Sequence, residues 1–377
     1  MRVYFDNAAS TPIRDEVGQF LKSGDAEGFY NPSSVHQEGQ KSRAKINKAR
    51  DLITEIFECQ TENILFTSSG TEACNYIISH AIHTYKIKNI LYLETEHSAV
   101  IDTVYSTEVN KVKCQITRDG IINLVDLENH LKNLQGKTLV CVMLVNNEIG
   151  VLQPIKDVSK ICKKYEALFF SDMIQALGKI DIREAVGFAD FASFASHKIG
   201  GLHGVGLVYM RNSQPVYKQF FGGEQEFGRK AGTENVIGIT AFQIALEACI
   251  NKMDEEHTNN IKLYEKLRDG VRQISKNIII PSLSSEKDAS ISTLIFPGLK
   301  SENIIIGLDI EGIAVSAGAA CSSGKIGGSH VLRALKYHES EANSAIRVSF
   351  GWHNYPEQVD FFLKTLNNTL HGMNFNF

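Results

Sequence analysis

The chain lacks the features that define several large classes of protein. Its seven cysteines are odd in number, irregularly spaced and without a CxxC pair, which argues against a disulfide framework or a zinc knuckle, and we expect no intrinsic metal. The net charge of -4 offers no basic face for a nucleic acid. No apolar run approaches the roughly 20 residues of a membrane span, and no GxGxxG motif opens a helix after an early strand, as a nicotinamide-binding domain requires. These absences predict a cytoplasmic protein that binds neither nucleic acid nor membrane.

At 377 residues the chain is too long for one ordinary core. From about residue 63 to 210, short apolar runs alternate with amphipathic stretches, which is the pattern of βα units around a mainly parallel sheet. The runs occupy residues 63–66, 89–93, 138–145, 167–171, 191–195 and 205–210. The loop between the last two is too short for a helical crossover, so residues 205–210 are predicted to lie antiparallel in the sheet.

Long helical patterns at residues 33–57 and 235–277 flank this region. After residue 281 the periodicity changes. It predicts strands at residues 290–296, 313–316 and 345–350, and helices at 301–308, 329–335 and 356–370. We therefore predict an α/β protein with a large domain over residues 14–250 and a smaller α+β domain built from residues 1–13 and 251–377.

Lys198 and Asp172 each come directly after a predicted strand. Open α/β sheets bind ligands at the C-terminal ends of their strands, so the two side chains should meet at one edge. A pyridoxal-phosphate enzyme needs a lysine amine to hold the aldehyde as a Schiff base and a carboxylate to keep the ring nitrogen protonated. Each residue alone is more often a surface cation or a helix cap, so the prediction depends on other residues at the same edge.

Three other segments are predicted to end at this edge. Residues 68–72 (SSGTE) open a helix, where small side chains and free N–H groups form either a phosphate cup or a simple cap. His97 is either a solvated capping residue or an acid/base group with a pKa near neutrality. Asn147 either forms a turn or contacts the cofactor or substrate.

Cys321 lies in a stretch that is rich in glycine, alanine and serine, residues 317–328 (AGAACSSGKIGG). The stretch has no large apolar anchor, so we expect an exposed, mobile loop. A cysteine on such a loop is suited to attack a bound sulfur atom and to deliver it elsewhere. The other six cysteines are interpreted as incidental.

Ten segments, in order and in spacing, resemble the NifS/IscS-type cysteine desulfurases, which belong to the class V branch of the fold type I pyridoxal-phosphate enzymes. They are residues 4–12 (YFDNAASTP), 31–36 (NPSSVH), 66–72 (FTSSGTE), 95–97 (TEH), 145–150 (VNNEIG), 172–175 (DMIQ), 196–198 (SHK), 231–235 (AGTEN), 316–324 (SAGAACSSG) and 346–347 (IR). The resemblance runs almost end to end. It implies a fold type I transferase, with a large, mainly parallel seven-stranded sheet domain and a smaller α+β domain that carries the Cys321 loop.

The resemblance also implies a role for each matching residue toward the cofactor, pyridoxal 5'-phosphate. Lys198 is expected to bind its aldehyde, Asp172 to pair with the pyridine nitrogen, and His97 to stack on the ring as the acid/base group. The remaining implied contacts are a hydrogen bond from Gln175 to the phenolic oxygen, a contact from Asn147, phosphate binding by Gly70, Thr71, Ser196 and His197, and a phosphate contact from Thr233 across a homodimer interface.

For the substrate, L-cysteine, the resemblance implies that Arg347 clamps the α-carboxylate, with Asn31 and Asn147 nearby. Cys321 is then expected to take the sulfur as a persulfide, to release L-alanine and to pass the sulfur to an iron–sulfur scaffold or a tRNA-modifying acceptor. A selenocysteine lyase, another class V activity and a non-catalytic scaffold are the alternatives.

Two local departures from the family pattern affect the cofactor loop. Ala195 stands where many relatives carry a phosphate-binding serine, so Ser196 substitutes for it or one phosphate bond is absent. Residues 201–204 (GLHG) replace the commoner Gly-Pro-Lys-Gly, and this puts the electrostatic role of that lysine in doubt.

Overall fold

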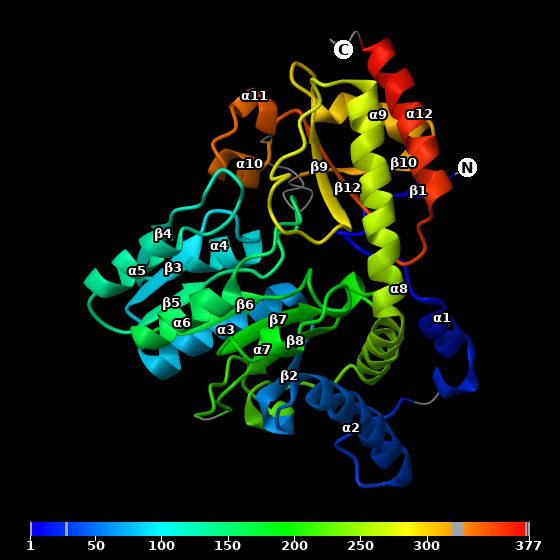
Figure 1. The fold of residues 1–377 in the computed structure, drawn as a ribbon. Helices are drawn as coiled ribbons and strands as arrows, with labels where there is room; N and C mark the ends of the chain where they lie inside the picture. The colour runs from blue at the N-terminus through cyan, green and yellow to red at the C-terminus, as the bar shows by residue number, and fades with distance from the viewer. Residues whose placement is uncertain (1, 27–28, 214, 319–327, 374, 376–377) are drawn as a thin grey trace.

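One seven-stranded sheet organises the larger part of the molecule (Figure 1). The structure is a computed structural model that describes residues 2–26, 29–213, 215–318, 328–373 and 375. The strand order is β2-β8-β7-β6-β5-β3-β4. The strands are β2 (Ile64–Thr67), β3 (Asn89–Leu93), β4 (Asn110–Cys114), β5 (Thr138–Cys141), β6 (Leu168–Asp172), β7 (Phe191–Ala195) and β8 (Gly206–Met210). This mainly parallel sheet confirms the α/β fold class.

Strand β8 is antiparallel to both of its neighbours, β2 and β7, whereas the other pairs are parallel. The antiparallel prediction for residues 205–210 is therefore confirmed. Strand β4 was not among the predicted apolar runs, because it is an edge strand with the sequence NKVKC and only its last residue is buried. Lysines on an edge strand discourage pairing with other chains, and they also hide the strand from a search for apolar runs.

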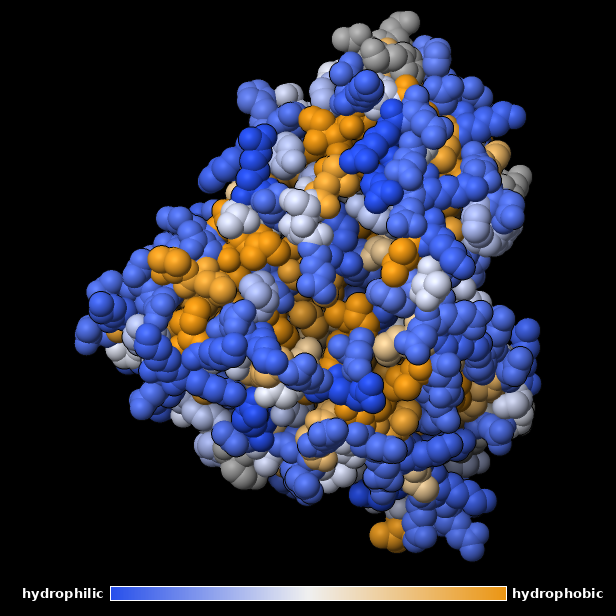
Figure 2. Space-filling model, in the orientation of Figure 1, coloured by the Kyte–Doolittle hydropathy of each residue, from blue (hydrophilic) through white to orange (hydrophobic). Residues whose placement is uncertain are grey.

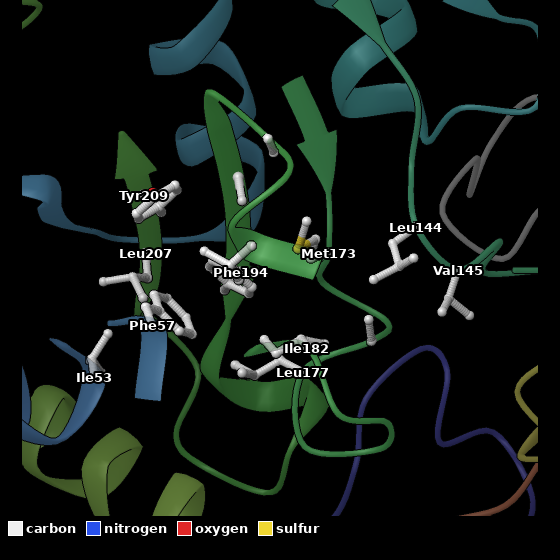
Figure 3. Packing of buried hydrophobic residues seen from close by; sticks show 14 of the residues in the cluster. Ile53, Phe57, Leu144, Val145, Met173, Leu177, Ile182, Phe194, Leu207 and Tyr209 are labelled. Carbon is white, nitrogen blue, oxygen red and sulfur yellow. The ribbon is translucent and has the colours of Figure 1, made fainter. Parts of the chain in front are cut away.

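Helices cover both faces of the sheet. On one face, α3 (Gly70–Tyr85) and α4 (Ser98–Ser106) pack against Ile90 and Phe170. On the other face, Ile53 and Phe57 of α2 (Gln37–Phe57) pack against Phe194 of β7 (Figure 3), with 5.0 Å between the ring centroids of Phe57 and Phe194. The same face is covered by α5 (Leu124–Asn133) and α6 (Ile155–Lys164). Shorter elements are α1 (Asp15–Lys22), α7 (Arg183–Val186) and the 3-10 turns Gly24–Ala26, Thr61–Asn63, Ser196–Lys198 and Glu226–Gly228.

Helix α8 (Val236–Ile274) connects the two parts of the molecule. Phe242 and Leu246 belong to the core of the large sheet, whereas Leu263 and Leu267 belong to a second core. An 18-residue window of α8 is apolar enough to cross a membrane by length and composition, and 61% of that window is buried in the molecule. On the face drawn in Figure 2, hydrophilic residues predominate and the apolar residues form separate areas.

The second core is covered by smaller sheets and by C-terminal helices. The antiparallel sheet β11-β12-β9 contains β9 (Ile291–Ile295), β11 (Ser316–Ala317) and β12 (Ala345–Ser349), and β1 (Val3–Tyr4) pairs with β10 (Ile313–Ala314). The predicted strand 313–316 is therefore two strands in different sheets, because the chain changes partner at Val315. The helices are α9 (Ser301–Ile310), α10 (His330–Ala334), α11 (Glu339–Ala342) and α12 (Pro356–Gly372).

The N-terminal arm joins the two parts. Phe5 is buried in the second core, and its backbone carbonyl accepts a hydrogen bond from the amide of Ser349 at 2.7 Å. A few residues later, the amide of Thr11 donates to the carbonyl of His197 at 3.0 Å. The arm therefore passes directly over the loop that follows β7.

Candidate active site

The structure brings Lys198 and Asp172 to the same edge of the large sheet. Asp172 is the last residue of β6 and pairs in register with Ser193 of β7. Lys198 ends the 3-10 turn that follows β7 directly. Because β6 and β7 are parallel neighbours, both residues emerge at the C-terminal end of the sheet, where open α/β sheets bind ligands.

Backbone carbonyls of the N-terminal arm hold the Lys198 ammonium. Its Nζ donates to the carbonyl oxygens of Ala8 at 2.7 Å and Ala9 at 2.8 Å. The Oγ1 of Thr11 donates in turn to the carbonyl of Lys198 at 3.1 Å. The position of this amine is thus set by a segment almost two hundred residues earlier in the chain.

Asp172 is buried, with 4% of its surface exposed. Its Oδ1 accepts the amide of Ile174 at 2.9 Å. Burial raises the pKa of the carboxyl to about 6, although the Ile174 amide, Ser193 and the charge of Lys198 act in the opposite direction. Among the described residues no ion pair includes Asp172, so the site favours a ligand that brings a positive group to this carboxylate.

His97 caps α4 and lies within the electric field of Lys198. Its Nδ1 accepts the amide of Ala99 at 3.0 Å, so the proton of the neutral ring is carried on Nε2. Burial, and then the charge of Lys198, lower the pKa of His97 to about 4. The capping interpretation is therefore confirmed. The expected pKa near neutrality is wrong for this structure, because burial and the charge of Lys198 both disfavour the protonated ring.

The start of α3 has the properties of an anion site. Ser69 caps this 16-residue helix through the amide of Glu72, and Gly70 is its first residue. A Cβ atom on Gly70 would lie 2.4 Å from the Cδ1 atom of Ile174, so a larger residue there would require the Ile174 side chain to move. Helix N-termini with free N–H groups bind phosphate, and Thr71 is exposed at this position.

Ser196 and His197 lie between β7 and Lys198. The Oγ of Ser196 is fully buried and has no hydrogen-bond partner among the described residues. The ring of His197 stacks on His203, with 5.2 Å between centroids, and burial lowers the pKa of His197 to about 3. His203, the departure from the family pattern, also lies 3.0 Å from the Oγ of Ser10 through its Nε2.

Arg347 is fully buried in β12. Its Nη1 donates to the carbonyl of Asn147 at 3.0 Å, and its Nη2 donates to Asp6 Oδ1 and Ser316 Oγ, both at 3.0 Å. The Nε of Arg347 and the Oδ1 of Asn147 are buried without partners among the described residues. An unsatisfied donor and an unsatisfied acceptor on two residues that contact each other are suited to an amino acid ligand.

Gln175 also lies close to Lys198. Its Nε2 donates to the carbonyl of Ala8 at 2.9 Å, which is the same acceptor that Lys198 uses. Its Oε1 accepts from the Nζ of Lys179 at 2.9 Å.

A family model described as aminotransferase class V matches residues 3–362 of the chain. The chain belongs to the class V aminotransferase family. The cysteine desulfurase IscS of Dictyoglomus turgidum is 35% identical over 376 residues, which cover 97% of this chain and 93% of that protein. A NifS-like protein from Rickettsia africae superposes with a TM-score of 0.89 at 31% identity, over 98% of this chain and 100% of the other. A second NifS-like protein superposes with a TM-score of 0.90 at 31% identity.

The residues of this class V aminotransferase fit pyridoxal 5'-phosphate, the cofactor of the family. Asp172 is a buried carboxylate that forms no ion pair with another described residue, so a protonated ring nitrogen would be a suitable partner for it. Ser196 provides a buried hydroxyl near the end of β7 that has no partner in the described part of the chain, and the start of α3 provides backbone amides for a phosphate. Lys198 is the amine at the same edge.

The described chain does not bring two of the predicted site residues, Asn31 and Thr233, to this group. Asn31 forms a local turn with the amides of Ser33 and Ser34, and no contact among the described residues joins it to Arg347. Thr233 lines a cavity of about 290 Å³ that Ser68 also lines. Cys321 lies outside the described residues.

Sequence reasoning missed Asp6, Glu148 and His330. The Glu148 carboxylate accepts a hydrogen bond from Ser329 Oγ and lies 3.4 Å from His330 Nδ1, while His330 Nε2 is 3.0 Å from the carbonyl of Glu96. Asp6 and Glu148 lie in segments that resemble the family, so motif membership was the available signal. No such signal exists for His330, whose contacts depend on the tertiary fold.

Proposed function

We propose that this class V aminotransferase is a cysteine desulfurase, which removes sulfur from L-cysteine and leaves L-alanine. One observation carries the proposal: the Lys198 amine shares one acceptor with the Gln175 amide, and its charge acts on the buried carboxylate of Asp172. This group of side chains matches the needs of pyridoxal 5'-phosphate. Cys321, which the sequence provides on a segment rich in small residues, distinguishes a desulfurase from an aminotransferase, since transamination has no use for a thiol.

When bound, pyridoxal 5'-phosphate supplies an electron sink for the α-carbon of the substrate. Asp172 keeps a charge-assisted hydrogen bond available to the ring nitrogen. Lys198 accepts or donates a proton at Nζ, and His97 carries a proton at Nε2. Arg347 binds the substrate carboxylate through its planar guanidinium, with Asn147 at its side.

The thiolate of Cys321 attacks the sulfur atom of the substrate. The carbon–sulfur bond breaks as the sulfur–sulfur bond forms, and the carbon skeleton takes up a proton and leaves as L-alanine. Cys321 is left as a persulfide, whose outer sulfur is passed to an acceptor protein for iron–sulfur cluster assembly or tRNA thiolation.

The proposal includes a cytoplasmic homodimer in which Thr233 of one subunit reaches the phosphate of the other. Its support is an exposed surface near Thr233, where Phe221 is 85% and Phe227 44% exposed. Glu226 and Glu234 line both the cavity that contains Thr233 and the neighbouring cavity that contains Phe227. Apolar side chains of this size in water are typical of a surface that another subunit covers.

The test is an incubation of the purified protein with L-cysteine, followed by measurement of alanine and sulfide with and without candidate acceptors. A desulfurase yields equal amounts of alanine and transferred sulfur. Turnover of selenocysteine alone would favour a lyase, and binding of partners without any turnover would favour a scaffold. Sedimentation of the active protein as a monomer would contradict the dimer.

A further inference from the structure

Lys179 lies beside the candidate site and has no part in the proposed reaction. Only 11% of its side chain is exposed. Its Nζ donates to Gln175 Oε1 at 2.9 Å and lies 3.8 Å from Asp288 Oδ2. Burial lowers the pKa of Lys179, and Asp288 opposes this effect. A buried cation is unfavourable unless its partners compensate for lost hydration, so its position here calls for an explanation.

The contacts of Gln175 leave its amide only one orientation. A lysine ammonium has donors and no acceptor, so Lys179 is able to face only the oxygen of that amide. The carbonyl of Ala8 is purely an acceptor, so it is able to face only the nitrogen. The two contacts agree. They place Nε2 beside the Nζ of Lys198, because both nitrogens donate to the same Ala8 oxygen.

We propose that Lys179 is a positioning residue that holds the Gln175 amide with its N–H groups toward the cofactor. The inference rests on the proposed function, because Gln175 is assigned to the phenolic oxygen of pyridoxal 5'-phosphate, which is a hydrogen-bond acceptor. An amide that rotates freely presents either a donor or an acceptor to that oxygen. Lys179 disfavours the flipped amide, in which the Oε1 of Gln175 would face the phenolic oxygen and repel it.

The position of Lys179 is itself fixed by Asp288. The two carboxylate oxygens of Asp288 accept from the amide and the Oγ of Ser290, at 2.9 and 2.6 Å. The amide of Asp288 donates to the carbonyl of Gly150 at 2.8 Å. Gly150 has a φ of +73°, and a Cβ atom there would lie 2.9 Å from the Asp288 carbonyl oxygen. This packing holds the negative charge of Asp288 near the Nζ of Lys179, which also donates to Gln175.

A small cavity adjoins both lysines and limits other interpretations. Lys179 and Lys198 line a space of about 20 Å³, which has room for about one water molecule. No substrate-sized ligand fits there, so a direct contact between Lys179 and substrate through this space is excluded. The groups whose charge acts on Lys179 are Asp288, Arg347 and Cys249, and none of them replaces the hydrogen bond to Gln175.

The experiment combines Lys179→Met with Gln175→Ala in a double-mutant cycle. Two properties of the protein loaded with pyridoxal 5'-phosphate are measured: cofactor affinity, and the pH midpoint of its visible absorbance. We expect Lys179→Met to weaken cofactor binding about tenfold, the range for one charge-assisted hydrogen bond, and to move the midpoint to higher pH. Without Lys179, the Gln175 amide no longer keeps its N–H groups toward the phenolic oxygen, and a nearby positive charge is absent. Each change favours the protonated form of the bound cofactor.

In the Gln175→Ala background, Lys179→Met should weaken cofactor binding no further, because Lys179 acts through the amide. Lys179→Arg should restore most of the affinity. Lys160→Met, at an exposed lysine that pairs with Asp157, is the matched control and should change neither property.

Equal losses of affinity in both backgrounds would overturn the proposal, and so would an unchanged absorbance midpoint in Lys179→Met. The readouts do not depend on desulfuration. A chain that binds the cofactor and releases no sulfur would therefore contradict the proposed function while leaving the positioning role testable by the same cycle. A wild-type chain that binds no cofactor would overturn both.

Discussion

Arg347 and Asp6 contact each other at 3.0 Å between Nη2 and Oδ1, although 341 positions separate them in the chain. Asp6 Oδ1 also accepts from Ser316 Oγ at 2.7 Å. Asp6 therefore compensates the charge of the fully buried Arg347 guanidinium. The Nε of Arg347 still has no partner among the described residues. A substrate carboxylate thus meets an arginine whose orientation is already set.

Replacement of Arg347 by lysine should raise KM for L-cysteine about tenfold or more, because the planar fork is lost while the charge is kept. Steady-state kinetics measure this effect. Asp6→Asn is the matched control: it should lower the free energy of unfolding by about 1–3 kcal/mol, the range for a weakened buried hydrogen bond, and change KM much less. Equal changes of KM in both variants would contradict a direct role for Arg347.

Lys198→Ala should abolish turnover and the visible absorbance of the bound cofactor, because this amine is the one held at the ends of β6 and β7. The measurement is a spectrum of the purified variant after incubation with pyridoxal 5'-phosphate. A wild-type spectrum in this variant would contradict the assignment of Lys198. Lys160→Met again provides a lysine variant that should keep its spectrum.

Asp172→Asn should make the cofactor-free protein more stable at neutral pH. Burial raises the folded-state pKa of Asp172 to about 6, above its unfolded value, so the native carboxyl binds its proton more tightly. Its ionisation therefore costs stability as the pH rises through about 4 to 6, on the order of 1–3 kcal/mol at pH 7. Denaturant unfolding at pH 7 and at pH 4 measures the difference, which should be small at the lower pH.

The same Asp172→Asn variant should lose most of its turnover, because the ring nitrogen loses its charge-assisted partner. A variant that is more stable without cofactor yet catalytically weak is the pattern expected of a functional carboxylate. An unchanged kcat would remove Asp172 from its proposed role.

Cys321→Ser should keep cofactor binding and abolish sulfur release. A serine hydroxyl is far less ionised than a thiol with a pKa of about 8.5, and it forms no persulfide. Visible spectroscopy, a persulfide assay and sulfide measurement separate the two steps. Persulfide formation on another cysteine of the variant would show that the nucleophile is misassigned.

His80 should make the protein less stable in mild acid. It is buried in α3 and stacks on Tyr76, and burial lowers its pKa to about 4. Because the folded pKa lies below the unfolded value of about 6.5, the unfolded chain binds more protons between these values. Stability is therefore complete above about pH 6.5 and declines as the pH falls toward 4, by at most about 3 kcal/mol from this group.

Replacement of His80 by phenylalanine keeps an aromatic ring and should flatten the dependence of the free energy of unfolding on pH in that window. His83→Phe is the control, because His83 is exposed on the same helix. An unchanged slope in His80→Phe would contradict the prediction. His97 and His197 also have lowered pKa values, so part of the slope should persist.

Local sequence determined the large sheet and the edge that carries the site. Short apolar runs with intervening amphipathic helices specify parallel strands, and parallel strands bring Asp172 and Lys198 to one edge by geometry alone. The edge strand β4 escaped this reasoning, because half-exposed strands carry no continuous apolar run. The split of residues 313–316 into β10 and β11 escaped it as well, since a change of partner strand leaves no mark in the periodicity.

Only the tertiary structure decided what surrounds these residues. The carbonyls of Ala8 and Ala9 reach Lys198, and Asp6 reaches Arg347, because the N-terminal arm joins the second core and crosses the loop after β7. Asp288, which follows α8 in the sequence, lies 3.8 Å from the Nζ of Lys179 through its Oδ2. Such contacts depend on which surfaces pack together, and periodicity reports only which face of each element is apolar.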